Sequence, residues 1–372
     1  MDSELSLSFT DKLLYLGRMA WSQAHLPIAL RRLSVAAEHM RERAFPLGAV
    51  LAREGEPMAS CHLLVEGRMR VSRRGTVLGE AEPGALVGLE ALLSQDHLGL
   101  GAVSATDVLT LQLDADTLLG ILGDHFSLIH NATQAAARRL LALMRRRPGL
   151  REASTGLSFP MPGHDDSAGL LFPPAGRQMN LIEVLLFLRT PGGPFERSSI
   201  DALAELAATV TQVPFEAGHV FWREGDPANR LSLVVEGSVA CSSGSGGAPS
   251  SFRVGPGRPL GALESMAGEP RWYDAVAETS GVLLDEDVDG LIDLFEDNTD
   301  VALDYLAWLS RTTLDFIEQE LGPGPELMEF FTTIAPSSPP TPFGIDGDDA
   351  RRVDGHAENI GRPAVATRTG GK

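Results

Sequence analysis

The chain contains one phrase twice. Residues 45–67 and residues 215–237 share a Phe-x-x-Gly start, an Arg-Glu-Gly-(Glu/Asp)-Pro centre and a Val-Glu-Gly end, all at identical spacing. Self-similarity of this kind means that one structural unit is used twice. The repeat therefore fixes the architecture before any single residue is interpreted.

Length and composition agree with two folded domains. The chain has 372 residues, 43% of them hydrophobic and 22% charged, which is close to the globular average. Residues 10–147 are predicted as the first domain and residues 179–322 as the second. A Pro/Gly-rich linker is expected over residues 148–178, and a disordered tail, rich in Ser, Pro, Gly and Asp, over residues 336–372.

The pattern within the first copy predicts helices, then strands, then a helix. Apolar residues recur at helical spacing over residues 11–44. From Phe45 to Asp114 short apolar runs alternate with glycines, which is typical of a compact β-roll, with Arg74-Gly75 as a hairpin tip. Helical spacing then resumes from an N-cap at Asp114 or Asp116 and continues to about Arg147.

The second copy repeats this order. Helices are expected at residues 180–188 and 199–211, strands from Phe215 to about Leu284, and a closing helix over residues 287–321. Its hairpin tip is expanded into residues 242–251, which read as a surface loop. The predicted class is α+β, mainly β: two tandem β-rolls (double-stranded β-helix or jelly-roll), each flanked by N-terminal helices and a long C-terminal helix.

Charge and cysteine content constrain the environment and the partners. The net charge is −19, and residues 151–372 hold 34 acidic but only 15 basic side chains, which disfavours nucleic acid as a partner. No apolar run approaches the roughly 18 residues of a membrane span. Cys61 and Cys241 are the only cysteines and fall in different copies, so two reduced thiols in a cytoplasmic protein are expected.

Enzyme chemistry finds little support in the motifs. Metal-dependent β-rolls need paired histidines on one strand, and neither roll contains a His-x-His pair. The chain also lacks a phosphate-binding P-loop and a Gly-x-Ser-x-Gly elbow. We therefore expect a protein that is not an enzyme, with no metal and no resident cofactor.

The repeated phrase, set between helices, resembles the cyclic-nucleotide-binding domain of bacterial cAMP-dependent regulators, protein kinase A regulatory subunits and cyclic-nucleotide-gated channels. The resemblance covers roughly residues 10–147 and 178–322. In that family a cassette between two strands, reading Phe-Gly-Glu, a short helix and Gly-x-Pro-Arg, holds the ligand. Backbone N–H groups at the helix start and the Arg bind the cyclic phosphate, while the Glu accepts from the ribose hydroxyl.

The second copy fits this cassette in part. Gly268-Glu269-Pro270-Arg271 reproduces the Gly-x-Pro-Arg step, so the resemblance implies that Arg271 is the phosphate ligand. The ribose Glu is replaced by Ala262, and Glu264 would substitute for it only if the helix were shifted. The predicted ligand-binding residues are therefore Gly261, Ala262, Leu263, Arg271, Trp272 and Tyr273.

Neighbouring residues carry alternative interpretations. Arg271 is either a phosphate ligand or the partner in a salt bridge, and the aromatic residues that follow it either cover a base or pack in a strand. Glu269 and Asp274 add negative charge that opposes capture of an anion.

The first copy departs further from the pattern. Leu89 stands in the Glu position, and the arginine position falls on Leu98 or Gly99. No Arg or Lys lies between Arg74 and Arg138, so a cyclic phosphate would lack a counter-charge, and this copy is expected not to bind cyclic nucleotides. Both copies are thus degenerate versions of the family.

The basic run Arg145-Arg146-Arg147 has two interpretations. It resembles a basophilic kinase site or inhibitor sequence, but that segment precedes the first nucleotide-binding domain in kinase regulatory subunits, whereas this run follows it. The favoured interpretation is a solvated helix C-terminus, where cations complement the helix dipole.

Two functional hypotheses remain. The first, which the sequence favours narrowly, is a non-catalytic regulator in which cAMP or cGMP binds the second roll at Arg271 and repositions the helix of residues 287–321, altering the interface with a protein partner. The second is a ligand-free interaction scaffold built from two degenerate rolls. Because members of the family often pair through their closing helices, the resemblance also implies a homodimer through the C-terminal helices.

Overall fold

The computed structural model describes residues 7–22, 30–95, 99–146, 178–189, 193–244, 250–318 and 322–333. Apart from Gln178, the predicted linker of residues 148–178 lies outside these ranges, and so does the whole predicted tail of residues 336–372.

The first copy folds into a roll of two antiparallel sheets. One sheet has the order β1-β8-β3-β6-β17 and the other the order β2-β7-β4-β5. The strands of this copy are β1 (Arg41–Phe45), β2 (Val50–Ala52), β3 (Ser60–Glu66), β4 (Met69–Arg73), β5 (Thr76–Ala81), β6 (Leu86–Val87), β7 (Gly101–Ser104) and β8 (Val108–Asp114). The last member of the first sheet, β17 (Thr332–Thr333), comes from the other end of the described chain.

The second copy repeats this topology strand for strand. Its sheets have the orders β14-β11-β16-β9 and β10-β15-β12-β13. Its strands are β9 (Thr211–Phe215), β10 (Val220–Trp222), β11 (Arg230–Glu236), β12 (Val239–Ser243), β13 (Ser250–Val254), β14 (Pro259–Leu260), β15 (Asp274–Ala277) and β16 (Gly281–Asp287). The predicted pair of tandem β-rolls is confirmed.

Helices flank both rolls. The first copy has α1 (Phe9–Ser22), α2 (Leu30–His39), α3 (Leu89–Leu93), α4 (Ala115–Asp124) and α5 (Phe126–Arg146). The second has α7 (Leu181–Leu188), α8 (Ile200–Thr209), α9 (Ala262–Ala267), α10 (Val288–Asp297) and α11 (Thr299–Phe316), and α12 (Pro325–Phe331) follows. The expected helix at residues 180–188 is α7, which begins with a complete capping box between Asn180 and Glu183.

Each closing helix is broken, in contrast to the single long helix predicted for each copy. The breaks fall at His125 and Asn298, which adopt nearly the same non-helical backbone conformation, with φ of −134° and −131°. The backbone break therefore recurs in both copies, and it separates a short helix from the longer α5 or α11.

Three further details correct the sequence prediction. Residues 41–44, predicted as helical, form part of β1 because they pair with β8. Residues 242–243 and 250–251, predicted as loop, belong to the β12–β13 ladder. α12 and β17 were not predicted at all. The tight turn at Arg74-Gly75 is confirmed, since both residues have positive φ and directly join β4 to β5.

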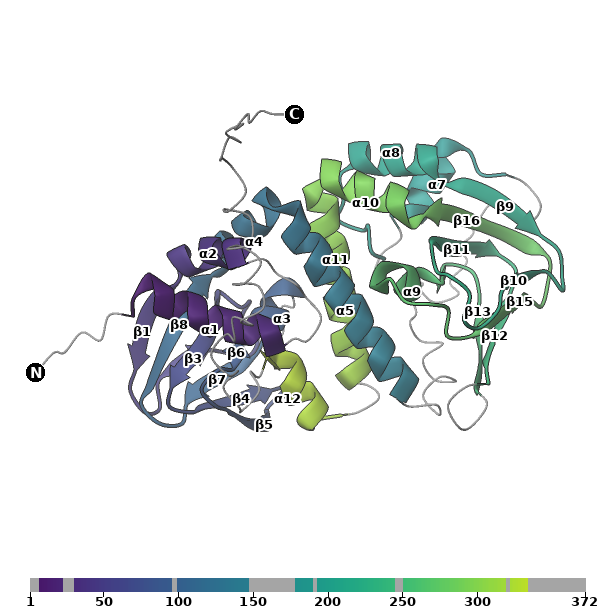
Figure 1. Cartoon of the computed structure of the whole chain (residues 1–372). Helices are drawn as coiled ribbons and strands as arrows, with labels where there is room; N and C mark the ends of the chain where they lie inside the picture. Colours follow the sequence, from purple (N-terminus) through teal and green to yellow (C-terminus); the bar gives the residue numbers. More distant parts are fainter. Residues whose placement is uncertain are drawn as a thin grey trace, which may run out of the picture. The chain divides into compact units, whose positions relative to one another are not determined.

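The closing helices of the two copies pack against each other. α5 contacts α11, and the two helices run alongside each other in Figure 1. Most apolar side chains of α11 are buried within this chain, among them Leu306, Leu309 and Leu314. The predicted homodimer through the C-terminal helices stays untested, but the apolar faces expected to mediate it are already covered.

The cysteines and the helices bear on the environment of the protein. Cys61 and Cys241 are both free and buried, as expected for reduced thiols. Among the described helices, none combines the length and the apolar character that crossing a membrane requires.

Candidate functional site

The side chain of Arg271 is buried and hydrogen-bonded to the protein through both terminal nitrogens, while its Nε has no hydrogen-bond partner among the described residues. It lies between α9 and β15 and is only 4% exposed. Its Nη1 donates to the carbonyl oxygen of Gly261 and its Nη2 to that of Arg230, both at 2.5 Å. Its guanidinium also lies over the ring of Trp222, 4.1 Å from the centroid. The arginine of the cassette therefore points inward and is already hydrogen-bonded.

Glu264 provides the counter-charge. Its side chain is buried on α9, with Oε2 3.7 Å from Nη1 of Arg271. Burial raises the pKa of the Glu264 carboxyl, and Arg271 counteracts this only in part. Burial likewise lowers the pKa of Arg271, while Glu264 opposes that shift. Glu264 thus acts as the ion-pair partner of the cassette arginine, and it is not turned outward as a ribose acceptor.

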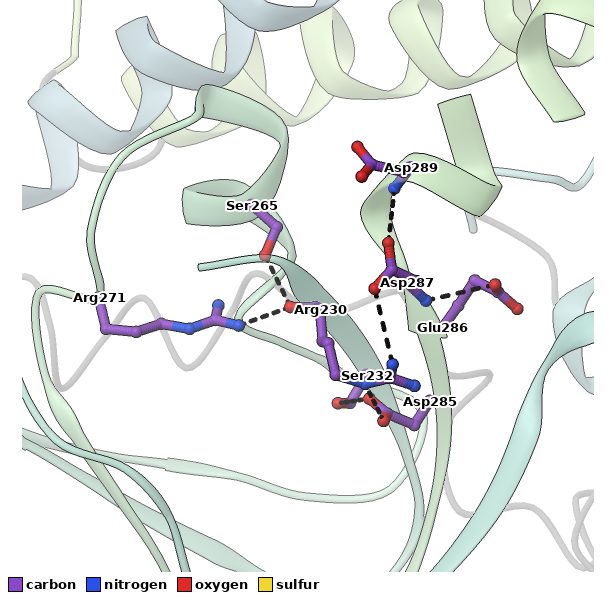
Figure 2. A network of polar contacts seen from close by, with 8 residues as sticks. All are labelled: Arg230, Ser232, Ser265, Arg271, Asp285, Glu286, Asp287 and Asp289. Carbon is purple, nitrogen blue, oxygen red and sulfur yellow. Dashed lines mark hydrogen bonds and ion pairs between the residues drawn. The ribbon is translucent and has the colours of Figure 1, made fainter. Parts of the chain in front are cut away.

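A polar network fixes the carbonyl oxygen that Arg271 contacts. Figure 2 shows the main chain of Arg230 receiving hydrogen bonds from Arg271 and from Ser265 Oγ, the latter at 2.6 Å. The side chain of Arg230 in turn pairs with Asp285 at 2.6 Å, and Ser232 Oγ donates to the same carboxylate at 2.6 Å. These contacts hold β11 and α9 together around the arginine.

Gly261 is required by this close packing. It is the N-cap of α9 with φ of +73°, a conformation that strongly favours glycine. A Cβ at this position would lie 2.2 Å from Nη1 of Arg271 and 2.9 Å from the ring of Trp222. The Gly261 N–H, which the family resemblance assigns to the phosphate, donates to the hydroxyl of Tyr273 at 3.2 Å.

Tyr273 and Trp272 fill the inside of the cassette. Tyr273 immediately precedes β15 and is buried, as are its neighbours Arg271 and Trp272, which places its ring inside the roll. Its ring centroid lies 5.0 Å from that of Phe252 and 5.7 Å from that of Trp222. Trp272 stacks on Phe252, with centroids 5.7 Å apart.

The space that remains beside these rings is small. A cavity of about 60 Å³ is lined by cassette residues, including Leu263, Trp272 and Tyr273, and by Leu140 and Met144 of α5. Pockets that bind ligands of nucleotide size have volumes of roughly 300 Å³ or more. The six predicted site residues therefore do come together, but they form a packed interior with room for a few waters.

The acidic residues near the cassette are neutralised. Asp274 pairs with Arg223 at 2.9 Å and also accepts the N–H of Glu224. Glu269 pairs with Arg145 at the end of α5. Both acids that were expected to oppose anion capture therefore have arginine partners, and Arg145, about one third exposed, makes a contact with the second roll that the sequence did not indicate.

Contacts from the first copy extend along α9. In addition to the Arg145–Glu269 pair, Arg138 Nε donates to the carbonyl oxygen of Ala267 at 2.8 Å. An ion pair and a hydrogen bond therefore join the cassette of the second roll to α5, the closing helix of the first roll. Sequence reasoning missed this because the two partners are more than 120 residues apart.

The cassette of the first roll is also closed. Its turn glycine, Gly88, has φ of +90°, and a Cβ there would lie 2.2 Å from Cε of Met58. At the predicted arginine position, Leu98 lies outside the described residues, and Gly99 has no side chain to offer. The Gly99 carbonyl oxygen instead accepts from Nη1 of Arg73 at 2.7 Å.

Comparison with known proteins identifies the two rolls. Residues 42–125 and 212–298 each match the family model of the cyclic nucleotide-binding domain. The chain therefore carries two cyclic nucleotide-binding domains in tandem.

Individual relatives resemble parts or most of the chain. A cyclic nucleotide-gated potassium channel of Mesorhizobium japonicum is 32% identical over 90 residues, which cover 24% of this chain and 24% of the channel, so the match spans about a quarter of that relative. The regulatory domain of Toxoplasma gondii PKA with cAMP is 16% identical over 81% of this chain and 97% of its own, with a TM-score of 0.30. The N-terminal domain of a transcriptional regulator from Streptomyces coelicolor is 28% identical over 34% of this chain and 90% of its own, with a TM-score of 0.31.

Proposed function

We propose that this chain is a non-catalytic regulatory protein that acts through protein contacts, and that its second cyclic nucleotide-binding domain is closed to cyclic nucleotides by its own side chains. One observation carries the proposal. The two groups that would hold a cyclic phosphate, the guanidinium of Arg271 and the N–H of Gly261, are both hydrogen-bonded within the protein.

The energetic cost of opening this site favours the closed state. A nucleotide would have to replace two hydrogen bonds of a charged group, each worth about 1.5–3 kcal/mol. It would also have to move the buried ring of Tyr273, whose transfer to water costs roughly another 2 kcal/mol. Ala262 offers no carboxylate to the ribose in return. The free energy of these lost contacts therefore weakens nucleotide binding, and the remaining contacts of the nucleotide would have to compensate for it.

The nucleotide sensor remains the alternative. In that account Arg271 would turn away from the carbonyl oxygens of Gly261 and Arg230, and α10 and α11 would move in response. The presence of Arg271 beside the N-terminus of α9 supports this alternative, whereas the packed aromatic interior opposes it. Both hypotheses make clear predictions about nucleotide binding.

Calorimetric titration of the protein with cAMP and with cGMP separates the two hypotheses. We expect no saturable heat at millimolar nucleotide. Saturable binding that is lost in an Arg271→Ala variant would establish the sensor and overturn the proposal. Saturable binding that survives this substitution would also contradict it, by showing a nucleotide site elsewhere in the chain.

An opened variant provides a positive control. Tyr273→Ala frees the N–H of Gly261 and enlarges the cavity, and Ala262→Glu restores a carboxylate at the start of α9. We expect the double variant to bind a cyclic nucleotide more tightly than the wild type does. Tyr273→Phe serves as the matched control, since it frees the N–H but keeps the ring in place, and should not gain binding.

The proposal also covers the kind of partner. The excess of acidic over basic side chains in residues 151–372 favours a protein partner over nucleic acid. We place the protein in the cytoplasm, and the two buried, free thiols support this because a reducing compartment keeps such groups unpaired.

A further inference from the structure

The cassette of the first roll is in contact with the far end of the described chain. β17 pairs with β6, with Thr332 opposite Val87 and Thr333 opposite Leu86, and so adds a strand to the sheet. The N–H of Gly88 donates to the carbonyl oxygen of Phe331 at 3.3 Å. α12 lies beside β5 and α3 (Figure 1). A segment near residue 330 thus covers the strand and the turn that begin the cassette.

An acidic side chain reaches the basic residues of this roll. Glu318, which follows α11, pairs with Arg73 and with Arg74, the latter at 3.0 Å. The side chain of Arg73 is only 2% exposed and that of Glu318 only 10%. Arg73 also contacts the ring of Phe331, 5.2 Å from the centroid. Arg73 is thereby held between the carboxylate, the aromatic ring and the carbonyl oxygen of Gly99.

Two aromatic residues anchor the segment. Phe330 and Phe331 are each 1% exposed and rank among the largest fully buried side chains of the described chain. Arg139 of α5 lies over the ring of Phe330 at 5.0 Å and donates to the carbonyl oxygen of Glu329 at 2.6 Å. Arg139 also pairs with Glu90 of the cassette helix. The segment is therefore held by hydrogen bonds to its backbone, by packing of its aromatic rings and by the ion pairs of Glu318.

These contacts have the chemistry of peptide recognition. We propose that the cassette of the first roll is a peptide-binding site, and that Glu318 together with residues 322–333 is its tethered ligand. The backbone of β17 adds to the sheet edge, the two phenylalanines fill apolar space, and the carboxylate of Glu318 neutralises Arg73. The class of ligand is an acidic residue followed by a short helix with paired aromatic residues and an extended end.

The short connection makes the segment a strong competitor. Glu318 lies two residues after the end of α11 at Phe316, and Pro325 lies nine residues after it, so the effective concentration of the segment at the site is in the millimolar range or above. A peptide of the same class from another protein would bind only when the segment is released. The inference does not depend on the second roll, because no residue of the Arg271 site takes part in these contacts.

Hydrogen exchange tests whether the segment can be released. In the full-length Phe330→Ala/Phe331→Ala variant, we expect amide exchange at residues 86–88 to accelerate at least about tenfold, which corresponds to a loss of about 1.4 kcal/mol of local stability. Phe295→Ala is the matched control, because Phe295 is an equally buried aromatic residue of α10 in the second roll. Phe295→Ala should accelerate exchange in the second roll, while exchange at residues 86–88 stays as in the wild type. Equal acceleration in both variants would overturn the proposal.

A peptide added in trans tests whether the opened site recognises the segment. We expect a fluorescent peptide of residues 317–335 to bind the double phenylalanine variant at least tenfold more tightly than the wild type, and Arg73→Ala in that variant to weaken the binding. Absence of binding to the opened variant would contradict a peptide site.

A charge variant guards against misfolding of the double variant. Glu318→Gln removes the ion pairs with Arg73 and Arg74 without opening a cavity, and should also accelerate exchange at residues 86–88. Glu329→Gln is its control, since the Glu329 side chain is exposed and only its carbonyl oxygen contacts Arg139. If Glu318→Gln and Glu329→Gln behave alike, the carboxylate plays no part in recognition and the proposal fails.

Discussion

Inside the second roll, Tyr273 and Arg271 make with the protein the contacts that a cyclic phosphate would otherwise make. The tyrosine hydroxyl accepts the N–H of Gly261, and the guanidinium donates to two carbonyl oxygens. Buried polar groups need such partners, because an unpaired donor costs about 1–3 kcal/mol. The free energy of unfolding of single variants at this site should therefore depend on the packing of these side chains and on their charge.

Gly261→Ala should be strongly destabilising. The added Cβ would approach Arg271 to 2.2 Å in a backbone with positive φ, so strain and overpacking together should cost about 3 kcal/mol. Gly218→Ala is the control, since Gly218 has φ of +83° but no atom within 4 Å of the added Cβ, and it should cost about 1 kcal/mol. Urea unfolding measures both. Equal losses would mean that the contact with Arg271 is not tight.

Glu264 should make stability depend on pH. Because burial raises the pKa of its carboxyl in the folded state, the folded protein binds more protons than the unfolded chain at pH values above the ordinary 4.5. The free energy of unfolding should therefore fall as the pH rises from 4.5 to the raised pKa. Glu264→Gln should lack this component, which the difference between the two pH profiles isolates. If the wild type instead gained stability relative to Glu264→Gln as the pH rises above 4.5, the raised pKa of Glu264 would be contradicted.

The sequence predicts which residues form the cassette of the second roll, but not the contacts that they make. The Gly-x-Pro-Arg step places Arg271 in the cassette, with Tyr273 two residues further on. The sequence carries no signal for the carbonyl oxygen of Arg230 as a partner, because every residue has one. That Tyr273 fills the site follows only once the register of β15 and the position of Phe252 are known.

At the scale of elements, each cassette is closed by a segment distant in sequence. α9 of the second roll packs against α5, and the cassette strand of the first roll pairs with β17. The helix breaks at His125 and Asn298 separate α4 from α5 and α10 from α11, and the longer helices α5 and α11 pack against each other. Helical periodicity continues across both breaks, which is why the sequence predicts one helix where the structure has two.

The pair of Arg145 and Glu269 should couple α5 to α9. Both side chains are about one third exposed, so solvent screening limits the expected interaction energy to about 0.5–1 kcal/mol in a double-mutant cycle. Arg53 and Glu56 provide the control, because their ion pair is mostly exposed and joins neighbouring residues. Coupling in the first pair no larger than in the second would mean that Arg145 behaves as a solvated helix end after all.

α12 and β17 could not have been predicted from local pattern. Their residues lie between a closing helix and a Pro-rich stretch, and a two-residue strand has no periodicity of its own. What positions them is the edge of β6 and the paired burial of Phe330 and Phe331, which are tertiary effects.

For the molecule as a whole, one large apolar cluster extends through both rolls, and a second, smaller cluster lies between the first roll and its helices α1, α2 and α4. Residues of α5, α11 and both rolls belong to a single buried cluster that includes Leu140, Leu203 and Leu309. Neither roll can lose its closing helix without exposing part of the other. The duplication seen in the sequence thus gives two similar units, but their mutual dependence follows from packing alone.

The described part of the chain should therefore unfold in a single transition. Differential scanning calorimetry should give one peak in which the van't Hoff and calorimetric enthalpies agree. Met144→Ala on α5, which removes a contact in the cavity beside Trp272, should lower the midpoint of this one peak without splitting it. Two separate peaks would show that the rolls fold as independent domains.

The central claim, that the second roll is closed by its own residues, is tested most directly at the amide of Gly261. Hydrogen exchange of this amide can be measured by NMR with and without millimolar cAMP or cGMP. Because the amide is already bonded to Tyr273, we predict the same protection in all three samples. Protection that increases with nucleotide and disappears in Arg271→Ala would show that the amide binds a phosphate, and would contradict the account.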